Sequence, residues 1–340
     1  TGTQAKVSYG DTIQLGTTGG TGTGTVTWTV TDARGNAPNS TITEGGLLTV
    51  KDVGGPITVT ATRSMGSNYG DVSATWEFSP TKKAVTAVVT AADRNYIAGD
   101  TTATVTATVP GSELVSGDSI SINGLTGTFD DANAGTNKKV TIDSSSASVS
   151  GTNSEKYEIT YPATTTASIL AGAATVNSKP EAVPSLTYNA AQSQELVTAG
   201  TATGGTMVYS LDGTNFTPAI PKAKNAGEYT VYFKAKGDGN HTDSDVGTVD
   251  VTIGRQTVTA PKIELNPPTA PYDGKVKRPE VTVLDADNNV IPVSEYKATY
   301  VTDGGKNWTD QGTYDVKVEN ITGGNYIVTT ATADFTISTT

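Results

Sequence analysis

The sequence predicts an all-β protein of four tandem antiparallel β-sandwich domains that together form an elongated rod. Three observations lead to this prediction: abundant threonine and glycine, short segments in which apolar and polar residues alternate, and an internal repeat of about 80–90 residues. β-branched side chains pack well on a pleated sheet, and glycine serves tight turns. No segment shows the 3.6-residue period of an amphipathic helix.

The composition argues against one large hydrophobic core. Apolar residues make up 35% of the 340 residues, whereas globular domains usually contain about 45–50%. Several small cores, one in each domain, account for this modest fraction. Each core would lie beneath strands with a two-residue period, because such strands bury one face and expose the other. Clear examples of this alternation are residues 72–78, 249–253 and 333–337, with a weaker one at 167–169.

A tyrosine followed by small or turn-forming residues opens each repeat. These four marker tyrosines are Tyr9, Tyr96, Tyr188 and Tyr272. A second marker, glycine-containing and followed by a strand, occupies residues 53–59, 225–231 and 310–316, with a looser version at 133–142. The markers and the turn-rich boundaries divide the chain into repeat 1 (1–80), repeat 2 (81–170), repeat 3 (171–254) and repeat 4 (255–340).

A third marker near the end of each repeat places an asparagine before an aromatic residue. It reads Asn68-Tyr69, Asn240-His241 and Asn325-Tyr326, and in repeat 2 an insertion separates its members, Asn153 and Tyr157. His241, the single histidine, therefore occupies a position that tyrosine fills in other repeats. We interpret it as a loop or packing residue, since no nucleophile elbow or oxyanion donor accompanies it.

Several functional classes are excluded by what the sequence lacks. It has no cysteine for disulfides or thiol chemistry, and no apolar run long enough to span a membrane. The net charge of -11, without a basic cluster, argues against nucleic-acid binding. No pair of carboxylates stands out as a hydrolytic site, so we predict no catalytic residue and no enzyme activity. We also expect a monomer, with any export signal and anchor outside this sequence.

The markers resemble tandem bacterial immunoglobulin-like (Ig-like) surface repeats, including the family named for its Tyr-Asp-Gly turn. The closest stretch runs from Leu186 through Tyr188-Asn189 to Asp212-Gly213, and Tyr272-Asp273-Gly274 carries the turn itself. The resemblance is strong in repeats 3 and 4, fair in repeat 1 and weaker in repeat 2. It implies Ig-like sandwiches in an extracellular, cell-surface or adhesin-like bacterial protein, and it implies no catalytic residue.

One short acidic segment is a candidate calcium site. Asp285, Asp287 and Asn289 alternate oxygen ligands as a calcium loop does, but the glycine and the closing glutamate of an EF-hand are missing. The alternative is a turn in which these side chains bond their own backbone. No other cofactor is expected.

One tryptophan is a candidate for ligand binding. Trp308 follows Lys306-Asn307 and the glycine pair Gly304-Gly305. An aromatic side chain exposed on such a turn could stack on a sugar. The alternative is packing between strands, which we expect for Trp28 and Trp76 because both have apolar neighbours two residues away.

The predicted function is a non-catalytic spacer or stalk that projects an adhesive or functional head from the bacterial envelope. The reason is repetition without any concentrated chemistry. The alternative is an adhesin module that binds a host glycan or matrix protein. Repeat 2 is then the expected binder, because it is the most divergent, and its loops 111–118 and 130–133 would form the site. A hydrolase is the least favoured reading.

Overall fold

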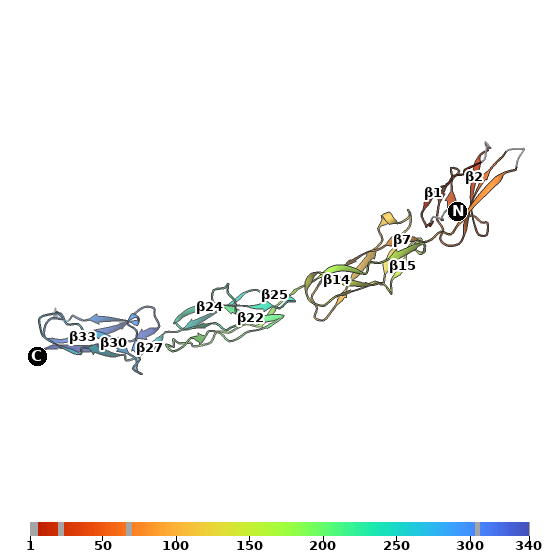
Figure 1. Ribbon diagram of the computed structural model, residues 1–340. Coiled ribbons are helices and arrows are strands. Elements are labelled where there is room, and N and C mark those ends of the chain that lie inside the picture. Colours follow the sequence, from red (N-terminus) through yellow and green to blue (C-terminus); the bar gives the residue numbers. More distant parts are fainter. Residues whose placement is uncertain (1–5, 20–23, 66–69, 303–306, 340) are drawn as a thin grey trace. The chain divides into compact units, whose positions relative to one another are not determined.

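The prediction of an all-β fold is confirmed by the computed structural model, which describes residues 6–19, 24–65, 70–302 and 307–339 (Figure 1). Within these ranges the only helical elements are three short 3-10 helices. None of the helices in the described ranges is long and apolar enough to cross a membrane. The chain forms two compact units, Thr1–Ala171 and Gly172–Thr340. Their boundary falls at the predicted boundary between repeats 2 and 3; the four-domain division itself remains a prediction.

Repeat 1 folds as two sheets around one core. One sheet has the order β1-β4-β3 and the other β2-β5-β6. Leu48 and Ile42 from the first sheet meet Val59, Trp28 and Trp76 from the second, so alternate side chains of both sheets form the interior. The strands are β1 (Thr12–Gln14), β2 (Val26–Asp32), β3 (Thr41–Ile42), β4 (Leu47–Thr49), β5 (Ile57–Arg63) and β6 (Val72–Phe78).

Repeat 2 carries a five-stranded sheet of order β10-β13-β14-β17-β9 and three two-stranded pairs, β7 with β16, β8 with β11 and β12 with β15. Its main core contains Phe129, Val140 and Ile169. Its elements are β7 (Lys83–Thr86), β8 (Val88–Ala91), β9 (Arg94–Asn95), β10 (Thr102–Ala103), β11 (Val105–Thr108), η1 (Gly111–Glu113), β12 (Ser121–Asn123), β13 (Thr126–Phe129), β14 (Gly135–Asp143), β15 (Ser148–Ser150), η2 (Ser154–Lys156), β16 (Tyr157–Thr160) and β17 (Thr164–Leu170).

Repeat 3 centres on the antiparallel sheet β22-β24-β26, whose buried residues Tyr209, Phe233 and Val251 pack against Leu196 and Val197. The pairs β18 with β25, β19 with β21 and β20 with β23 complete it. Its strands are β18 (Gly172–Ala173), β19 (Thr175–Ser178), β20 (Gln194–Glu195), β21 (Thr201–Thr203), β22 (Gly205–Ser210), β23 (Lys222–Ala223), β24 (Gly227–Gly237), β25 (His241–Thr242) and β26 (Gly247–Ile253).

Repeat 4 packs the sheet β28-β30-β31 against the sheet β29-β35-β33-β32, with β27 paired to β34. Val283 and Ile291 from the first sheet meet Val318 and Tyr296 from the second. Its elements are β27 (Gln256–Val258), β28 (Lys262–Asn266), β29 (Thr269–Pro271), β30 (Glu280–Leu284), β31 (Val290–Ile291), η3 (Val293–Glu295), β32 (Tyr296–Tyr300), β33 (Gly312–Asn320), β34 (Tyr326–Val328) and β35 (Ala331–Ser338).

The long strands pair antiparallel as predicted, but parallel pairs that the sequence did not predict link the start of a repeat to its end. In repeats 2, 3 and 4 the first strand lies parallel to the segment that carries the third marker. The first residue of that segment is opposite the first residue of the opening strand in every case: Tyr157 opposite Lys83, His241 opposite Gly172 and Tyr326 opposite Gln256.

Candidate functional site: the tyrosine junctions

The four marker tyrosines occupy corresponding positions in their repeats. Each donates its backbone N–H to a carbonyl at or just beyond the end of the last strand of the same repeat, at the end where the chain leaves it. These bonds are Tyr9 to Thr81 (2.9 Å), Tyr96 to Leu170 (2.8 Å), Tyr188 to Gly254 (2.8 Å) and Tyr272 to Ser338 (2.9 Å). The repeat pattern read from the sequence therefore corresponds to a repeated position in space.

In the first unit, the marker tyrosine of repeat 1 packs against repeat 2. The rings of Tyr9 and Tyr157 meet edge to face, with centroids 5.5 Å apart. Both hydroxyls donate to Oδ2 of Asp118, Tyr9 over 2.8 Å and Tyr157 over 2.6 Å. Nδ2 of Asn153 donates to Oδ1 of the same carboxylate over 2.7 Å. We call these four residues the first junction.

Local structure in repeat 2 positions the first junction. Asn153 adopts a left-handed conformation at the start of η2, and β16 begins with Tyr157 directly after that helix. The backbone N–H of Val115 donates to the Tyr157 hydroxyl over 2.8 Å. Nζ of Lys156 lies 5.1 Å from the Tyr9 ring centroid and donates to the carbonyl of Lys51 over 3.1 Å. The two repeats are thus joined by ring packing, a cation–π contact and hydrogen bonds.

These contacts shift the pKa values of the three ionisable groups. Burial alone would raise the pKa of Asp118, but the hydrogen bonds from Asn153, Tyr157 and Tyr9 outweigh it and lower the pKa below its usual value. Burial, followed by the hydrogen bond to Asp118, raises the pKa of Tyr157 to about 12 and that of Tyr9 further. Near neutral pH the junction therefore holds a carboxylate between two protonated phenols.

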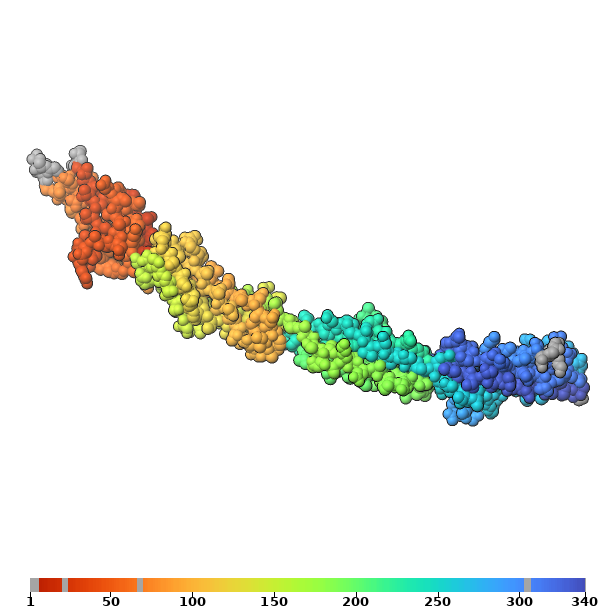
Figure 2. Space-filling view, turned by 180° about the vertical axis from the view of Figure 1, so that it is seen from behind, coloured from red at the N-terminus to blue at the C-terminus, as the bar shows by residue number. Residues whose placement is uncertain are grey.

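In the second unit, the marker tyrosine of repeat 3 packs against repeat 4 in a similar way, and Figure 2 shows the two repeats in direct contact. The rings of Tyr188 and Tyr326 meet edge to face, with centroids 5.2 Å apart. The backbone N–H of Ala226 donates to Oδ1 of Asn325 over 2.8 Å. The buried Glu295 accepts the backbone N–H groups of Asn325 (2.6 Å) and Tyr326 (3.1 Å) through Oε2. Tyr188, Ala226, Glu295, Asn325 and Tyr326 form the second junction.

The structure gives the candidate calcium ligands the arrangement of a turn. Oδ1 of Asp285 accepts the N–H groups of Asp287 (2.9 Å) and Asn289 (2.8 Å), and Oδ2 accepts Nδ2 of Asn289 (3.0 Å). These hydrogen bonds lower the pKa of Asp285. Within the described ranges, no group of three or more His, Cys, Asp or Glu side chains could hold a metal ion. The contacts at this segment are thus those of the alternative, a turn whose side chains accept hydrogen bonds from nearby backbone N–H groups.

The expectation that Trp308 is exposed for ligand binding is wrong. Its side chain is 2% exposed and lies in the core of repeat 4. It stacks on Tyr314 (4.7 Å between centroids) and Phe335 (5.8 Å) and meets Tyr300 edge to face (5.0 Å). The preceding Gly304-Gly305 pair lies outside the described residues. Three aromatic partners from other strands give the indole more buried contact than an exposed turn could.

The two loops expected to form a binding site in repeat 2 are not brought together. The 111–118 loop reaches Asp118 in the first junction, and its Leu114 and Val115 pack in the cluster that contains Tyr9. The 130–133 loop precedes Ala134, which packs in the main core of repeat 2. Its carboxylates Asp130 and Asp131 pair with Lys138 at 3.3 and 2.9 Å.

His241 takes the tyrosine position that the third marker predicts. It faces Gly172 across the β18–β25 pair, as Tyr157 and Tyr326 face their opening strands. Its Nδ1 lies 2.7 Å from Oδ1 of Asp238, and its ring lies so close to Gly204 that a Cβ there would be 2.7 Å away. The ring is therefore packed against glycine backbone. The Asn68-Tyr69 pair of repeat 1 lies outside the described residues.

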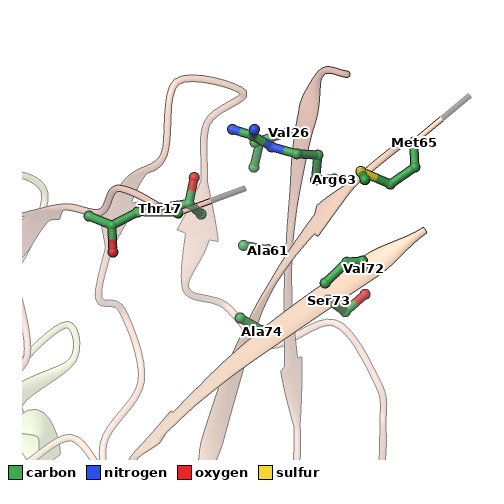
Figure 3. A pocket seen from close by; sticks show the side chains of 10 residues that line it. Thr17, Val26, Ala61, Arg63, Met65, Val72, Ser73 and Ala74 are labelled. Atoms are coloured by element: carbon green, nitrogen blue, oxygen red, sulfur yellow. The ribbon is translucent and has the colours of Figure 1, made fainter. Parts of the chain in front are cut away.

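Repeat 1 contains an apolar pocket of about 340 Å³ on the β2-β5-β6 sheet (Figure 3). Val26, Ala61, Val72 and Ala74 form its floor and walls, and Arg63 is the charged residue among those that line it. None of the described residues that line it carries a carboxylate.

Comparison with known proteins finds one family model in the chain. The YDG domain matches residues 81–167, which is nearly all of repeat 2. This is the repeat in which the sequence resemblance was weakest, since Tyr96 is followed by Ile97-Ala98, whereas repeat 4 carries Tyr272-Asp273-Gly274. The match therefore does not require a Tyr-Asp-Gly sequence at the marker tyrosine. No curated protein matches the chain.

Solved structures with a similar arrangement have low sequence identity and low structural scores. Drosophila N-cadherin EC1-4 is 12% identical, with 98% of this chain and 96% of that chain covered and a TM-score of 0.23. Sidekick-1 immunoglobulin domains 1-5 are 13% identical, with coverages of 98% and 78% and a TM-score of 0.28. A Bacteroides ovatus glucan-utilisation protein, SGBP-B, in complex with a mixed-linkage heptasaccharide, is 12% identical, with coverages of 99% and 67% and a TM-score of 0.16. These scores support no functional transfer.

Proposed function

We propose that the chain is a non-catalytic spacer of a bacterial cell-surface protein, in which four β-sandwich domains hold an adhesive or functional head away from the envelope. The observation that carries the proposal is the repeated junction. In each unit the marker tyrosine of one repeat packs edge to face on a tyrosine of the next, and hydrogen bonds cross between the repeats.

Such junctions favour a fixed angle between neighbouring domains. Rotation at the first junction would separate the Tyr9 ring from Tyr157 and remove a hydrogen bond to a charged acceptor. Rotation at the second would separate Tyr188 from Tyr326 and leave the Ala226 N–H without Asn325. Interfaces between domains in one chain otherwise permit relative motion unless specific contacts oppose it. A spacer that holds a head at a fixed position needs contacts that oppose motion between its domains.

The dimensions follow from strand geometry. Strands of six to eight residues at about 3.3 Å per residue, with end loops, give each sandwich a length of about 35–40 Å. Four in line would extend to about 150 Å. The acidic chain, with its abundant threonine, suits an extracellular setting.

Small-angle X-ray scattering tests the proposal. A rod of about 150 Å has a radius of gyration of about 43 Å, whereas a globule of this length has one of about 20 Å. A value near 40 Å, retained at moderate salt, supports the spacer. A value near 20 Å overturns it.

A second candidate function is glycan binding, and one observation favours it. A groove of about 710 Å³ lies beside the second junction, lined by Tyr188, Asn189, Gln194 and Asn289 among others. Amide side chains next to aromatic rings offer hydrogen bonds and a stacking face to sugar hydroxyls and rings. In this proposal the candidate site lies in the second unit, whereas the sequence alone predicts repeat 2 as the binder. Glycan-array binding that is lost with Gln194→Ala would support it, and the absence of binding leaves the spacer alone.

A further inference from the structure

Tyr272 corresponds to Tyr9 and Tyr188 but is open to solvent. Its backbone N–H makes the same bond to the end of the last strand. Yet its side chain is 46% exposed, whereas that of Tyr9 is 3% exposed beneath repeat 2. Val276, four residues further along, is 61% exposed. The end of repeat 4 therefore presents an apolar surface at the position that is covered in repeats 1 and 3.

The backbone after Tyr272 follows the path seen at the second junction. Oδ1 of Asn189 accepts the N–H of Ala191 over 2.9 Å directly after Tyr188. Oδ1 of Asp273 accepts the N–H of Lys275 over 3.0 Å directly after Tyr272. The same turn after the tyrosine thus recurs in repeats 3 and 4.

The backbone position that makes the second contact of the second junction also has a counterpart in repeat 4. In repeat 3, Ala226 donates to the next repeat from the residue just before β24, and β24 begins with Gly227 opposite Ile253. In repeat 4, the residue just before β33 is Gln311, which is exposed, and β33 begins with Gly312 opposite Ile337. We call these three exposed residues, Tyr272, Val276 and Gln311, the Tyr272 face.

We propose that the Tyr272 face is a docking surface for a further β-sandwich repeat that carries an Asn-Tyr pair like Asn325-Tyr326. The incoming tyrosine packs edge to face on Tyr272, and the incoming asparagine accepts the backbone N–H of Gln311. We choose this partner because, in both units, the tyrosine that corresponds to Tyr272 packs against a tyrosine of the next repeat. The inference rests on the proposed spacer function and extends it by one interface.

The test adds the proposed occupant to the chain. Because Ser338 corresponds to Gly254, residues 1–338 are followed directly by a second copy of residues 255–340. The sequence contains no cysteine, so two engineered ones can carry spin labels. One label is placed by Glu280→Cys, and the other by Lys297→Cys in the added copy. Double electron–electron resonance then reports the distance across the new interface, and we expect one narrow peak.

Two variants of the exposed face should abolish that peak. Tyr272→Ala removes the ring, and Val276→Asp places a charge on the apolar surface; both positions are exposed, so repeat 4 should still fold. Tyr272→Phe should retain the narrow peak. The control pair, Ser193→Cys with Lys297→Cys of the original repeat 4, reads the second junction and should not change in either variant.

The outcomes separate this inference from the proposed function. A broad distribution at the new interface with a narrow one at the second junction overturns the docking surface alone. Broad distributions at both overturn the rigid-spacer proposal as well. A dimer of the unextended chain in sedimentation that is lost with Tyr272→Ala assigns the face to a second copy and also overturns the proposal.

Discussion

The two junctions bring together the same pair of rings but place their acidic group differently. At the first junction, Asp118 accepts hydrogen bonds from both tyrosine hydroxyls, so a charge bridges the two repeats. At the second, Glu295 stays within repeat 4 and holds the backbone of Asn325 and Tyr326. The bonds that cross there are neutral ones of the Asn325 amide, which accepts the Ala226 N–H and donates to Oδ1 of Asn225 over 3.4 Å. The two junctions therefore share the edge-to-face geometry of their rings but differ in the hydrogen bonds that join the repeats.

The tyrosine pair alone therefore does not determine the stability of the interface between two repeats. Hydrogen bonds to a charged acceptor contribute more than neutral ones. The first junction should therefore respond more strongly to substitution than the second, and Asp118 should make it sensitive to acid.

The largest effect is expected for Asp118→Ala. It removes the acceptor of three side-chain donors and leaves two phenol O–H groups without an acceptor, so the free energy of unfolding of the first unit should fall by about 2–3 kcal/mol. Denaturant unfolding in a Trp308→Phe background measures this, since Trp28 and Trp76 then supply the fluorescence. The control is Asp143→Ala, an exposed turn aspartate of repeat 2, expected to cost about 1 kcal/mol or less. Equal losses in the two variants would contradict the account.

Removing single hydroxyls should distinguish the two junctions. Tyr157→Phe loses the bond to Asp118 and the acceptor of the Val115 N–H, which should cost about 1.5–2 kcal/mol. Tyr326→Phe keeps the ring contact and the Glu295 bonds to the backbone, and should change stability by about 0.5 kcal/mol or less. Calorimetry of both variants makes the comparison. A larger loss for Tyr326→Phe would reverse the assignment of the charged junction.

Acid should loosen the first junction through protonation of Asp118. Because the folded pKa of Asp118 is lowered, its stabilisation is present above the unfolded value and is lost as pH falls through the folded value. Spin labels across the first junction should therefore show broadening as pH falls below about 4, the usual pKa of an aspartate. The Asp118→Asn variant should remove this pH dependence. Broadening in the parent chain that is unchanged by Asp118→Asn would show another cause.

A smaller effect is expected for Asn325→Ala at the second junction. The Ala226 N–H loses a neutral acceptor, which should cost about 1 kcal/mol. The label pair across this junction should broaden while the pair across the first does not. Broadening of the distance distribution across the first junction alone would refute the role of Asn325.

The smallest effect concerns calcium at the turn beside the second junction. Asp285 already accepts three hydrogen bonds from N–H donors, so we expect the melting temperature of the second unit to be the same in millimolar calcium and in chelator. Asp285→Ala should lower it equally in both. Stabilisation by calcium that is lost in Asp285→Ala would restore Asp285, Asp287 and Asn289 as a metal site.

Local patterns in the sequence predict the long alternating strands, the spacing of the marker tyrosines and the boundary near residue 171. Period-two alternation and turn residues act within a few positions, so 72–78 and 333–337 were recognised directly. The marker tyrosines could be placed in corresponding positions because the repeat itself carried the information.

The junctions could not be predicted, because their contacts join residues far apart in sequence. Asp118 lies 109 positions from Tyr9, and no pattern relates the two. Trp308 was misplaced for a similar reason, since its partner Phe335 lies on another strand. The parallel pairing of opening strands with the third marker also depends on closure of each sandwich, which a local pattern does not encode.

Within each unit, the ordered tyrosine junction should hold the two repeats at a fixed angle. The most direct measurement is the distance distribution between spin labels at Ala33→Cys in repeat 1 and Ser146→Cys in repeat 2, in the parent chain and with Tyr9→Ala. We expect a single narrow peak that broadens when the Tyr9 ring is removed. A broad distribution in the parent chain, unchanged by Tyr9→Ala, would show that the junction does not fix this angle.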